Sequence, residues 1–186
     1  MRDETVARNY AQSLFDLALR HEGLAAYQSG IETVAALLDE NPKFRLFVET
    51  PRIDARDKKE VVRKAFADAL PKGLLNFLLV VIDKRRQRIL RDIARQFHAL
   101  VDEHENRVHV EVTVAHDLDE ATTAAVAERL GALLGKTAVP EVRVKPEIIG
   151  GMIVRTGDTV YDGSLRRRLG GLRRRLLATA LPDDEG

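Results

Sequence analysis

Residues 150–176 read GGMIVRTGDTVYDGSLRRRLGGLRRRL. Here two short runs with β-forming residues flank the dipeptide Gly157-Asp158. This pattern predicts a β-hairpin, because glycine accepts the positive φ that a two-residue turn requires. Ser164 then predicts the start of a helix, since its hydroxyl can accept hydrogen bonds from the free N–H groups of the first turn. Asp162, just ahead, would favour the helix dipole or brace the hairpin.

The residues before this stretch predict one helix and two further strands. Valine alternates with polar residues over 108–114, which is the two-residue period of a half-buried strand. Acids at positions 117, 119 and 120 suit a helix start, and Gly135 suits its end. The run EVRVKPEII, residues 141–149, predicts the next strand. The order from residue 106 onward is therefore β-α-β-β-β-α, a small α+β domain.

The first half of the chain has the helical period instead. Its apolar residues recur every three or four positions, with breaks at glycine and prolines. The predicted helices are residues 5–20, 24–40, 44–49, 54–70 (with Asp54 as N-cap), 74–83 and 88–105. Short helices with short connections are typical of a bundle.

The change of period marks a domain boundary near residues 104–107. We therefore expect a mainly α protein with an N-terminal six-helix bundle, residues 1–105, followed by a small α+β domain, residues 106–182. The final helix is expected to end near Leu181, before Pro182, and residues 183–186 are expected to be a disordered tail.

The composition is that of a soluble globular protein. The 186 residues are 45% hydrophobic and 32% charged, with a net charge of +1, so the chain as a whole is not built to neutralise a polyanion. The absence of Cys excludes disulfides, thiolate zinc sites and cysteine nucleophiles. The longest apolar run, residues 74–82, is about half of the ~20 residues that a membrane span needs. Without a visible signal peptide or organelle presequence, we expect a soluble cytoplasmic protein of bacterial origin.

The glycines and acids of residues 150–163 raise two ligand-binding hypotheses that fail. A phosphate loop needs a helix directly after its glycines, whereas Gly150 and Gly151 precede a predicted strand. A calcium loop needs acids at alternating positions and a Glu at the twelfth, which Asp158 and Asp162 do not provide. The histidines lack metal-binding spacing, and no catalytic motif is visible. The sequence predicts no enzyme, no metal site and no cofactor.

The helix predicted after Ser164 is rich in arginine. Its leucines at 165, 169, 172 and 176 form one apolar stripe. The remaining surface carries Arg166, Arg167, Arg168, Arg173, Arg174 and Arg175. This face is either solvated, with its stems covering neighbouring core, or it binds an acidic protein or a nucleic acid. From residue 106 onward there are 12 Lys and Arg and 12 Asp and Glu, which favours a protein and leaves nucleic acid open.

Two glycines in the middle of this helix predict a close neighbour. Gly170 and Gly171 would each cost the helix roughly 1 kcal/mol relative to Ala. The simplest reason for such a cost is the close approach of another backbone.

Taken in order, these residues resemble a known family. The matching positions of the second half are Gly150, Gly151, Arg155, Gly157, Asp158, Asp162, Gly163, Ser164 and Leu169. In the first half, VARNYAQSLFDLA, residues 6–18, is similar to the family's opening helix, and VIDKRRQRIL, residues 81–90, to the segment between its fifth and sixth helices. The family is the delta subunit of bacterial F-type ATP synthase, known in mitochondria as the oligomycin-sensitivity-conferring protein. The resemblance runs from about Val6 to Leu177.

The resemblance implies a groove between the first and fifth helices that receives the N-terminal helix of an alpha subunit. The residues expected at this groove are Val6, Tyr10, Leu14, Leu17, Asn76, Leu79, Val80 and Asp83. Read from the residues alone, the apolar positions among them are core.

The resemblance also implies a stator function. The bundle would bind the catalytic headpiece, and the α+β domain, with the Arg face of its last helix, would contact the C-terminal region of the b subunits of the peripheral stalk. The protein would couple proton transport to ATP synthesis without catalysis of its own, peripherally on the cytoplasmic face of a bacterial membrane. The alternative is a nucleic-acid-binding protein that uses the Arg-rich last helix.

Overall fold

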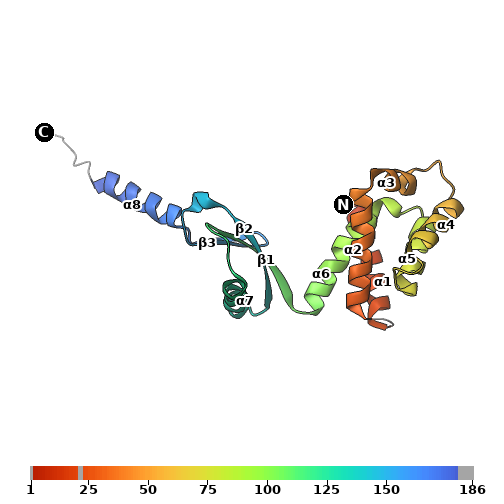
Figure 1. The fold of residues 1–186 in the computed structure, drawn as a ribbon, viewed down its shortest axis with the longest axis horizontal. Coiled ribbons are helices and arrows are strands. Elements are labelled where there is room, and N and C mark those ends of the chain that lie inside the picture. The colour runs from red at the N-terminus through yellow and green to blue at the C-terminus, as the bar shows by residue number, and fades with distance from the viewer. Residues whose placement is uncertain (1, 21–22, 180–186) are drawn as a thin grey trace. The chain divides into compact units, whose positions relative to one another are not determined.

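The computed structural model describes residues 2–20 and 23–179 (Figure 1). The expected tail, residues 183–186, and the expected helix end near Leu181 lie outside the described residues. The contacts within the chain divide it into two units, residues 1–104 and 105–186. Each unit has its own hydrophobic core, as an independent domain does.

Within residues 2–20 and 23–104 the structure has six α-helices and one 3-10 helix. They are α1 (Arg2–Arg20), α2 (Leu24–Glu40), α3 (Pro42–Glu49), α4 (Ala55–Phe66), α5 (Lys72–Asp83), η1 (Gln87–Ile89) and α6 (Leu90–His104). The mainly helical first half is therefore confirmed. So is the cap of α4, because the Asp54 carboxylate accepts a hydrogen bond from the Arg56 N–H at 2.9 Å. The expected helix over 54–70 ends early, at Phe66, and the chain continues in a turn in which the Ala69 and Leu70 N–H groups both donate to the Phe66 carbonyl oxygen.

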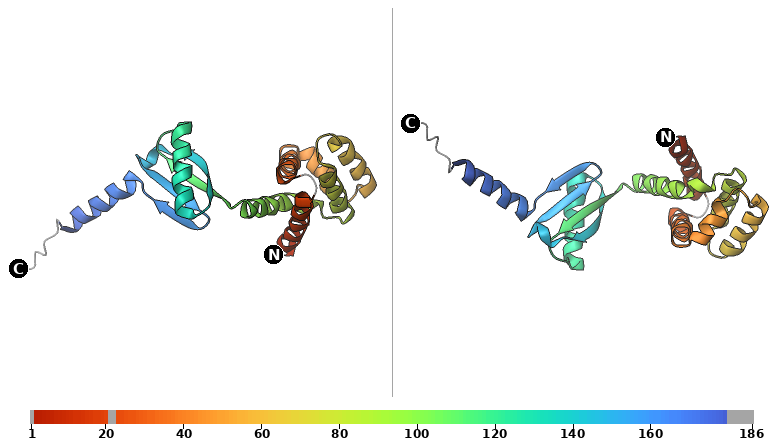
Figure 2. Two further views of the ribbon diagram at one scale, coloured as in Figure 1. Left: turned by 90° about the horizontal axis from the view of Figure 1, so that it is seen from below. Right: turned by 90° about the horizontal axis from the view of Figure 1, so that it is seen from above.

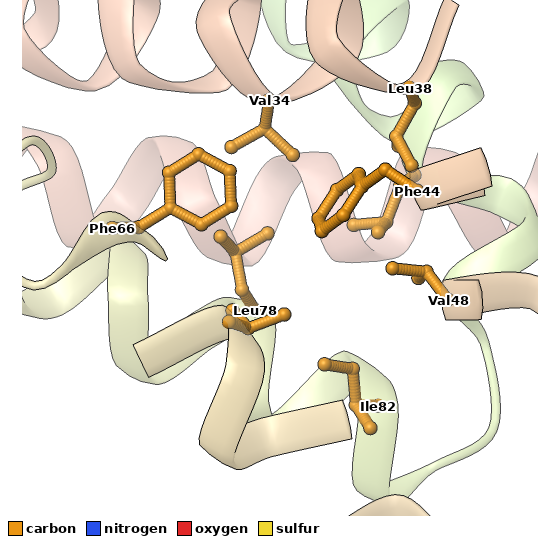
Figure 3. A pocket seen from close by; sticks show the side chains of 9 residues that line it. Val34, Leu38, Phe44, Val48, Phe66, Leu78 and Ile82 are labelled. Atoms are coloured by element: carbon orange, nitrogen blue, oxygen red, sulfur yellow. The ribbon is translucent and has the colours of Figure 1, made fainter. Parts of the chain in front are cut away.

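The core of the first unit is closely packed. Phe44 and Phe66 meet edge to face, with ring centroids 6.2 Å apart. Together with aliphatic side chains of α2 and α5 they surround a void of only about 10 Å³ (Figure 3). That volume is about one water-sized sphere. The apolar centre of the bundle is therefore structural core, with no room for a ligand.

Residues 105–179 form a sheet with helices. The elements are β1 (Arg107–Val114), α7 (Glu120–Leu134), β2 (Thr137–Val144), η2 (Pro146–Ile148), β3 (Met152–Thr156), β4 (Thr159–Asp162) and α8 (Leu165–Thr179). In the described part of the chain the strands lie in the order β2-β1-β3-β4; β1 pairs parallel with β2, and β3 pairs antiparallel with β1 and β4. The order β-α-β-β-β-α is confirmed.

Helix α7 covers one face of this sheet (Figure 2). Val110, Val112 and Val114 are buried beneath it with Val126 and Leu130 of α7. The alternation of valines over residues 108–114 therefore marks the buried face, as predicted.

The prediction of a strand over residues 141–149 has the wrong limits. β2 covers Thr137–Val144 and so includes Pro140, while Pro146 begins η2. Because β2 lies at the edge of the sheet, the missing N–H of Pro140 is tolerated there. The sequence does not show which strand will be at the edge.

Candidate partner-binding surfaces

Helices α1 and α5 meet along a seam of partly buried side chains. The rings of Tyr10 and Phe77 make an edge-to-face contact with centroids 6.2 Å apart. Further along, the side chain of Leu17 lies 3.4 Å from the position that a Cβ atom on Gly73 would take. The later residue of α1 thus pairs with the earlier residue of α5, so the two helices run in opposite directions along this seam.

The eight residues predicted for the groove divide into two groups. Leu14 is fully buried and Leu79 is only 8% exposed, so these two side chains belong to the core and do not reach the surface. The six at or near the surface are Val6, Tyr10, Leu17, Asn76, Val80 and Asp83. The sequence reading of the apolar positions as core therefore holds for Leu14 and Leu79.

The polar end of the seam is tied to a neighbouring helix. The Asp83 carboxylate forms an ion pair with the Lys59 ammonium of α4 at 2.6 Å. Val80, one turn earlier, is 49% exposed. The exposed valine and the adjacent carboxylate give this part of α5 a mixed surface.

Phe77 is a seam residue that sequence reasoning missed. It is partly buried, packs against the core and contacts Tyr10. The sequence held a signal for it, because Phe77 is a large apolar residue one turn before Val80. It therefore lies on nearly the same side of the helix.

The signature residues of the second unit shape a turn and a helix cap. Gly157 takes a φ of +55° between the paired Thr156 and Thr159, which confirms the predicted hairpin turn. The Ser164 hydroxyl accepts a hydrogen bond from the Arg167 N–H at 3.2 Å, which confirms Ser164 as the cap of α8. The Asp162 carboxylate in turn accepts a hydrogen bond from the Ser164 N–H at 3.0 Å.

Hydrogen bonding and charge lower the pKa of Asp162. The main cause is hydrogen bonding by Ser164, through its side chain and its backbone N–H, and the positive charges of Arg167 and Arg166 add to it. The first two arginines of α8 therefore act on the hairpin carboxylate, and Asp158 remains an exposed turn residue.

Helix α8 exposes its leucines as well as its arginines. Leu165, Leu169, Leu172 and Leu176 are 42%, 53%, 54% and 71% exposed. The residues Arg166, Arg167, Arg168, Arg173, Arg174 and Arg175 are also exposed. This exposure agrees with the expected solvated arginine face, and among the described residues α8 packs mainly against η2.

The two glycines of α8 have open space around them. A Cβ atom on Gly171 would meet no described atom within 4 Å, and one on Gly170 would meet only the Arg174 guanidinium at 4.0 Å. The close backbone neighbour expected from the sequence is absent from the described part of this chain.

The described residues hold no group of three or more His, Asp or Glu side chains that could bind a metal ion. The two surfaces that stand out are thus the α1–α5 seam and the exposed leucine and arginine faces of α8. Both are suited to protein contact.

Comparison with known proteins gives the family. Residues 6–176 match the family model described as ATP synthase delta (OSCP) subunit. The chain belongs to the ATP synthase delta (OSCP) family. The delta subunit of Gemmatimonas aurantiaca is 41% identical over 179 residues, which cover 96% of this chain and 97% of that protein. The delta subunit of Moorella thermoacetica is 40% identical, with 91% of this chain and 94% of that protein covered.

The fold of this delta-family chain recurs in a solved complex. A chain in the cryo-EM structure of the Toxoplasma gondii mitochondrial ATP synthase hexamer superposes with a TM-score of 0.66 at 22% identity. The match covers 92% of this chain and 97% of that one. Two units with a helical bundle and a small sheet are thus a shared architecture.

Family membership confirms the resemblance read from the sequence and gives a coarse function. Delta (OSCP) subunits are components of the peripheral stalk of F-type ATP synthase, so the partners of this delta-family chain are other ATP synthase subunits. Nothing in the comparisons supports the nucleic-acid alternative. The complex is membrane-associated, and within the described residues no helix has the length and apolar character to cross a membrane.

Proposed function

We propose that this chain is a non-catalytic stator subunit that links the alpha/beta catalytic headpiece of a bacterial F-type ATP synthase to its b subunits. Residues 1–105 bind the N-terminal helix of an alpha subunit, and residues 106–182 contact the C-terminal region of the b subunits. The chain lies peripherally on the cytoplasmic face of the membrane. By holding the headpiece against rotation, it keeps proton transport coupled to ATP synthesis.

The observation that carries the headpiece contact is the α1–α5 seam. Tyr10 and Phe77 are partly buried and Val80 is 49% exposed, so apolar surface remains open between two antiparallel helices. An amphipathic helix laid along such a surface buries its apolar side chains against it. Asn76 and Asp83 supply polar groups on α5 for the edge of that contact.

Calorimetric titration of the full chain with a synthetic peptide, taken from the N-terminus of an alpha subunit, tests this contact. We expect saturable binding at one to one, and loss of binding when Val80 is replaced by Asp, because a carboxylate would be desolvated in the seam. Val61→Asp is the matched control, since Val61 is also a valine within a helix, α4, and is 40% exposed. Absent binding to the folded chain, or equal loss in both variants, would contradict the seam as the site.

The exposed faces of α8 support the second contact. Helix α8 exposes leucines on one side and arginines on the other. On binding, it can bury the leucines against a stalk helix and pair the arginines with acidic groups of that helix. Replacing Arg166–Arg168 and Arg173–Arg175 by Gln should weaken binding to a fragment from the C-terminal region of the stalk's b protein, more at low salt than at physiological salt. Unchanged binding at both salt concentrations would remove the arginines from this contact.

A further inference from the structure

A polar pocket of about 570 Å³ lies in the first unit, and none of the eight residues predicted for the groove lines it. Its walls come from the connection between α3 and α4, the first turn of α4, and the turn from α5 into η1. Ile82, which also borders the apolar core (Figure 3), lines it. The volume falls within the roughly 300–1,000 Å³ of small-molecule sites.

Positive charge predominates in the lining. Four cations line the pocket, Arg52, Lys58, Arg85 and Arg88, against two carboxylates, Glu49 and Asp54. Asp54 is already engaged, because its carboxylate caps α4. Among the described residues, none of the four cations forms an ion pair within 4.0 Å. The lining therefore has a net charge of about plus two.

One of these cations is buried, which is rare for lysine. Lys58 is 2% exposed, and its ammonium donates a hydrogen bond to the Thr50 carbonyl oxygen at 2.5 Å. Burial lowers the pKa of Lys58, and the charges of Arg85 and Arg88 lower it further. The fold thus holds three cations close enough to repel one another.

Gln87 is 8% exposed, and its Oε1 atom has no hydrogen-bond partner among the described residues; this oxygen is an acceptor and needs a donor, which a phosphate dianion does not supply. Arg85 adopts a φ of +56° because it ends α5: its N–H donates to the Ile82 carbonyl oxygen and the Arg86 N–H donates to the Val81 carbonyl oxygen, both at 2.9 Å. An anion among the cations would offset their repulsion.

We propose that this pocket binds a phosphate dianion, free or as a monoester, through the side chains of Lys58, Arg85 and Arg88. A dianion matches the net charge of the lining, whereas a single carboxylate offsets half of it. Arginine forks match the oxygen geometry of phosphate, and lysine adds a point charge. The volume beyond that of the phosphate leaves space for the organic part of an ester.

This site differs from a phosphate loop. No glycine lines it, and the start of α4 is capped by Asp54, whose carboxylate occupies the position that an anion would take at a helix N-terminus. Side-chain cations therefore do the binding. The proposal is independent of the stator function, because its residues lie outside the predicted contacts with the headpiece and the stalk.

Titration of the full chain at low ionic strength tests the proposal, with inorganic phosphate in one arm and ribose 5-phosphate in the other. Backbone NMR signals would report the site. We expect one saturable site, with shifts at residues 85–88 and at Lys58. Tighter binding in the second arm assigns the pocket to an ester, and equal binding assigns it to free phosphate.

Single substitutions distinguish binding at this pocket from a general attraction of anions to the positively charged surface. Arg88→Gln and Arg85→Gly should each lower affinity about tenfold or more, as the loss of a charge-assisted hydrogen bond does. Glycine also relieves the positive φ of residue 85, so Arg85→Gly should unfold at a higher temperature while binding more weakly. Glu49→Gln should bind more tightly, because it removes the carboxylate that is not engaged in a cap.

Arg86→Gln is the matched control, because Arg86 is exposed in the same turn but does not line the pocket. Its affinity should stay within about twofold of the parent chain, since exposed charges are screened. Equal losses for Arg86→Gln and Arg88→Gln, or shifts that never saturate, would overturn the proposal. So would unchanged binding in folded Arg85→Gly.

Discussion

Gly151 lies so close to Gly163 that a Cβ atom added to Gly151 would collide with the Gly163 carbonyl oxygen and lie 3.4 Å from the Cα atom of Ser164. The same Gly151 has a φ of +75°. The chain entering β3 therefore touches the chain leaving β4, just where α8 begins. This contact explains why the signature has glycine there.

Gly151→Ala should destabilise the second unit more than Gly157→Ala. Both glycines have positive φ, which costs an alanine roughly 1–2 kcal/mol, but a Cβ atom at Gly157 meets nothing within 4 Å. The collision at Gly151 should add about 1–3 kcal/mol. Urea unfolding followed by the NMR signals of Val112 and Val154 measures both. Equal losses would mean that the Gly163 contact is relieved by a small backbone shift.

Acidification should weaken the hairpin and cap of the second unit. The pKa of Asp162 is lowered from its ordinary value of 3.8, mainly through hydrogen bonding by Ser164. A carboxylate with a depressed pKa binds fewer protons in the folded state, so its stabilisation is present above about pH 4 and is lost as pH falls through the lowered pKa. The difference in stability between the parent chain and Asp162→Asn should thus shrink on acidification. A constant difference from neutral to acidic pH would contradict this.

Gly73→Ala should destabilise the helical bundle although alanine favours helices. A Cβ atom at Gly73 would collide with the hydroxyl of Tyr27, a fully buried side chain that has no room to move. We expect a loss of about 1–3 kcal/mol by denaturant unfolding. In the double variant with Tyr27→Phe the losses should be less than additive, because the colliding oxygen is gone. Strict additivity would show that the two residues are not in contact.

Much of this fold could be predicted because it depends on neighbouring residues. The alternation over residues 108–114, the Gly157 turn and the Ser164 cap are local patterns, and the structure has each of them. The limits of β2 depend on its edge position, which is set by pairing with β1 far away in the sequence. Local patterns therefore predicted the elements better than their ends.

The candidate sites were harder to predict, because exposure is a property of the assembled fold. Leu14 and Val6 share one helical stripe, yet Leu14 is fully buried and Val6 is only partly buried. The leucines of α8 have the spacing of a core stripe and are exposed. For Lys58 the sequence gives the charge, whereas its burial and the neighbouring charges of Arg85 and Arg88 are properties of the fold.

A partner of α8 could bind on its leucine stripe or against its glycines, and these two hypotheses make opposite predictions. At 3.6 residues per turn, Gly170 and Gly171 lie on the other side of the helix from Leu169 and Leu172. Leu169→Gln and Leu172→Gln should change stability by less than about 0.5 kcal/mol, since both side chains are already exposed. They should nevertheless weaken binding to the same C-terminal fragment of the stalk's b protein, because a partner that packs on the stripe would lose apolar contact.

Gly170→Ala and Gly171→Ala should instead raise the helicity of α8, by roughly 1 kcal/mol of helix propensity each, because both positions have space for a methyl group. A partner bound on the leucine stripe would then bind as tightly as before, or more tightly to the better-ordered helix. Circular dichroism and calorimetry on the four single variants distinguish the two faces. Weaker binding by the alanine variants, with the glutamine variants unaffected, would place the partner's backbone against the glycines and remove the leucines from the contact.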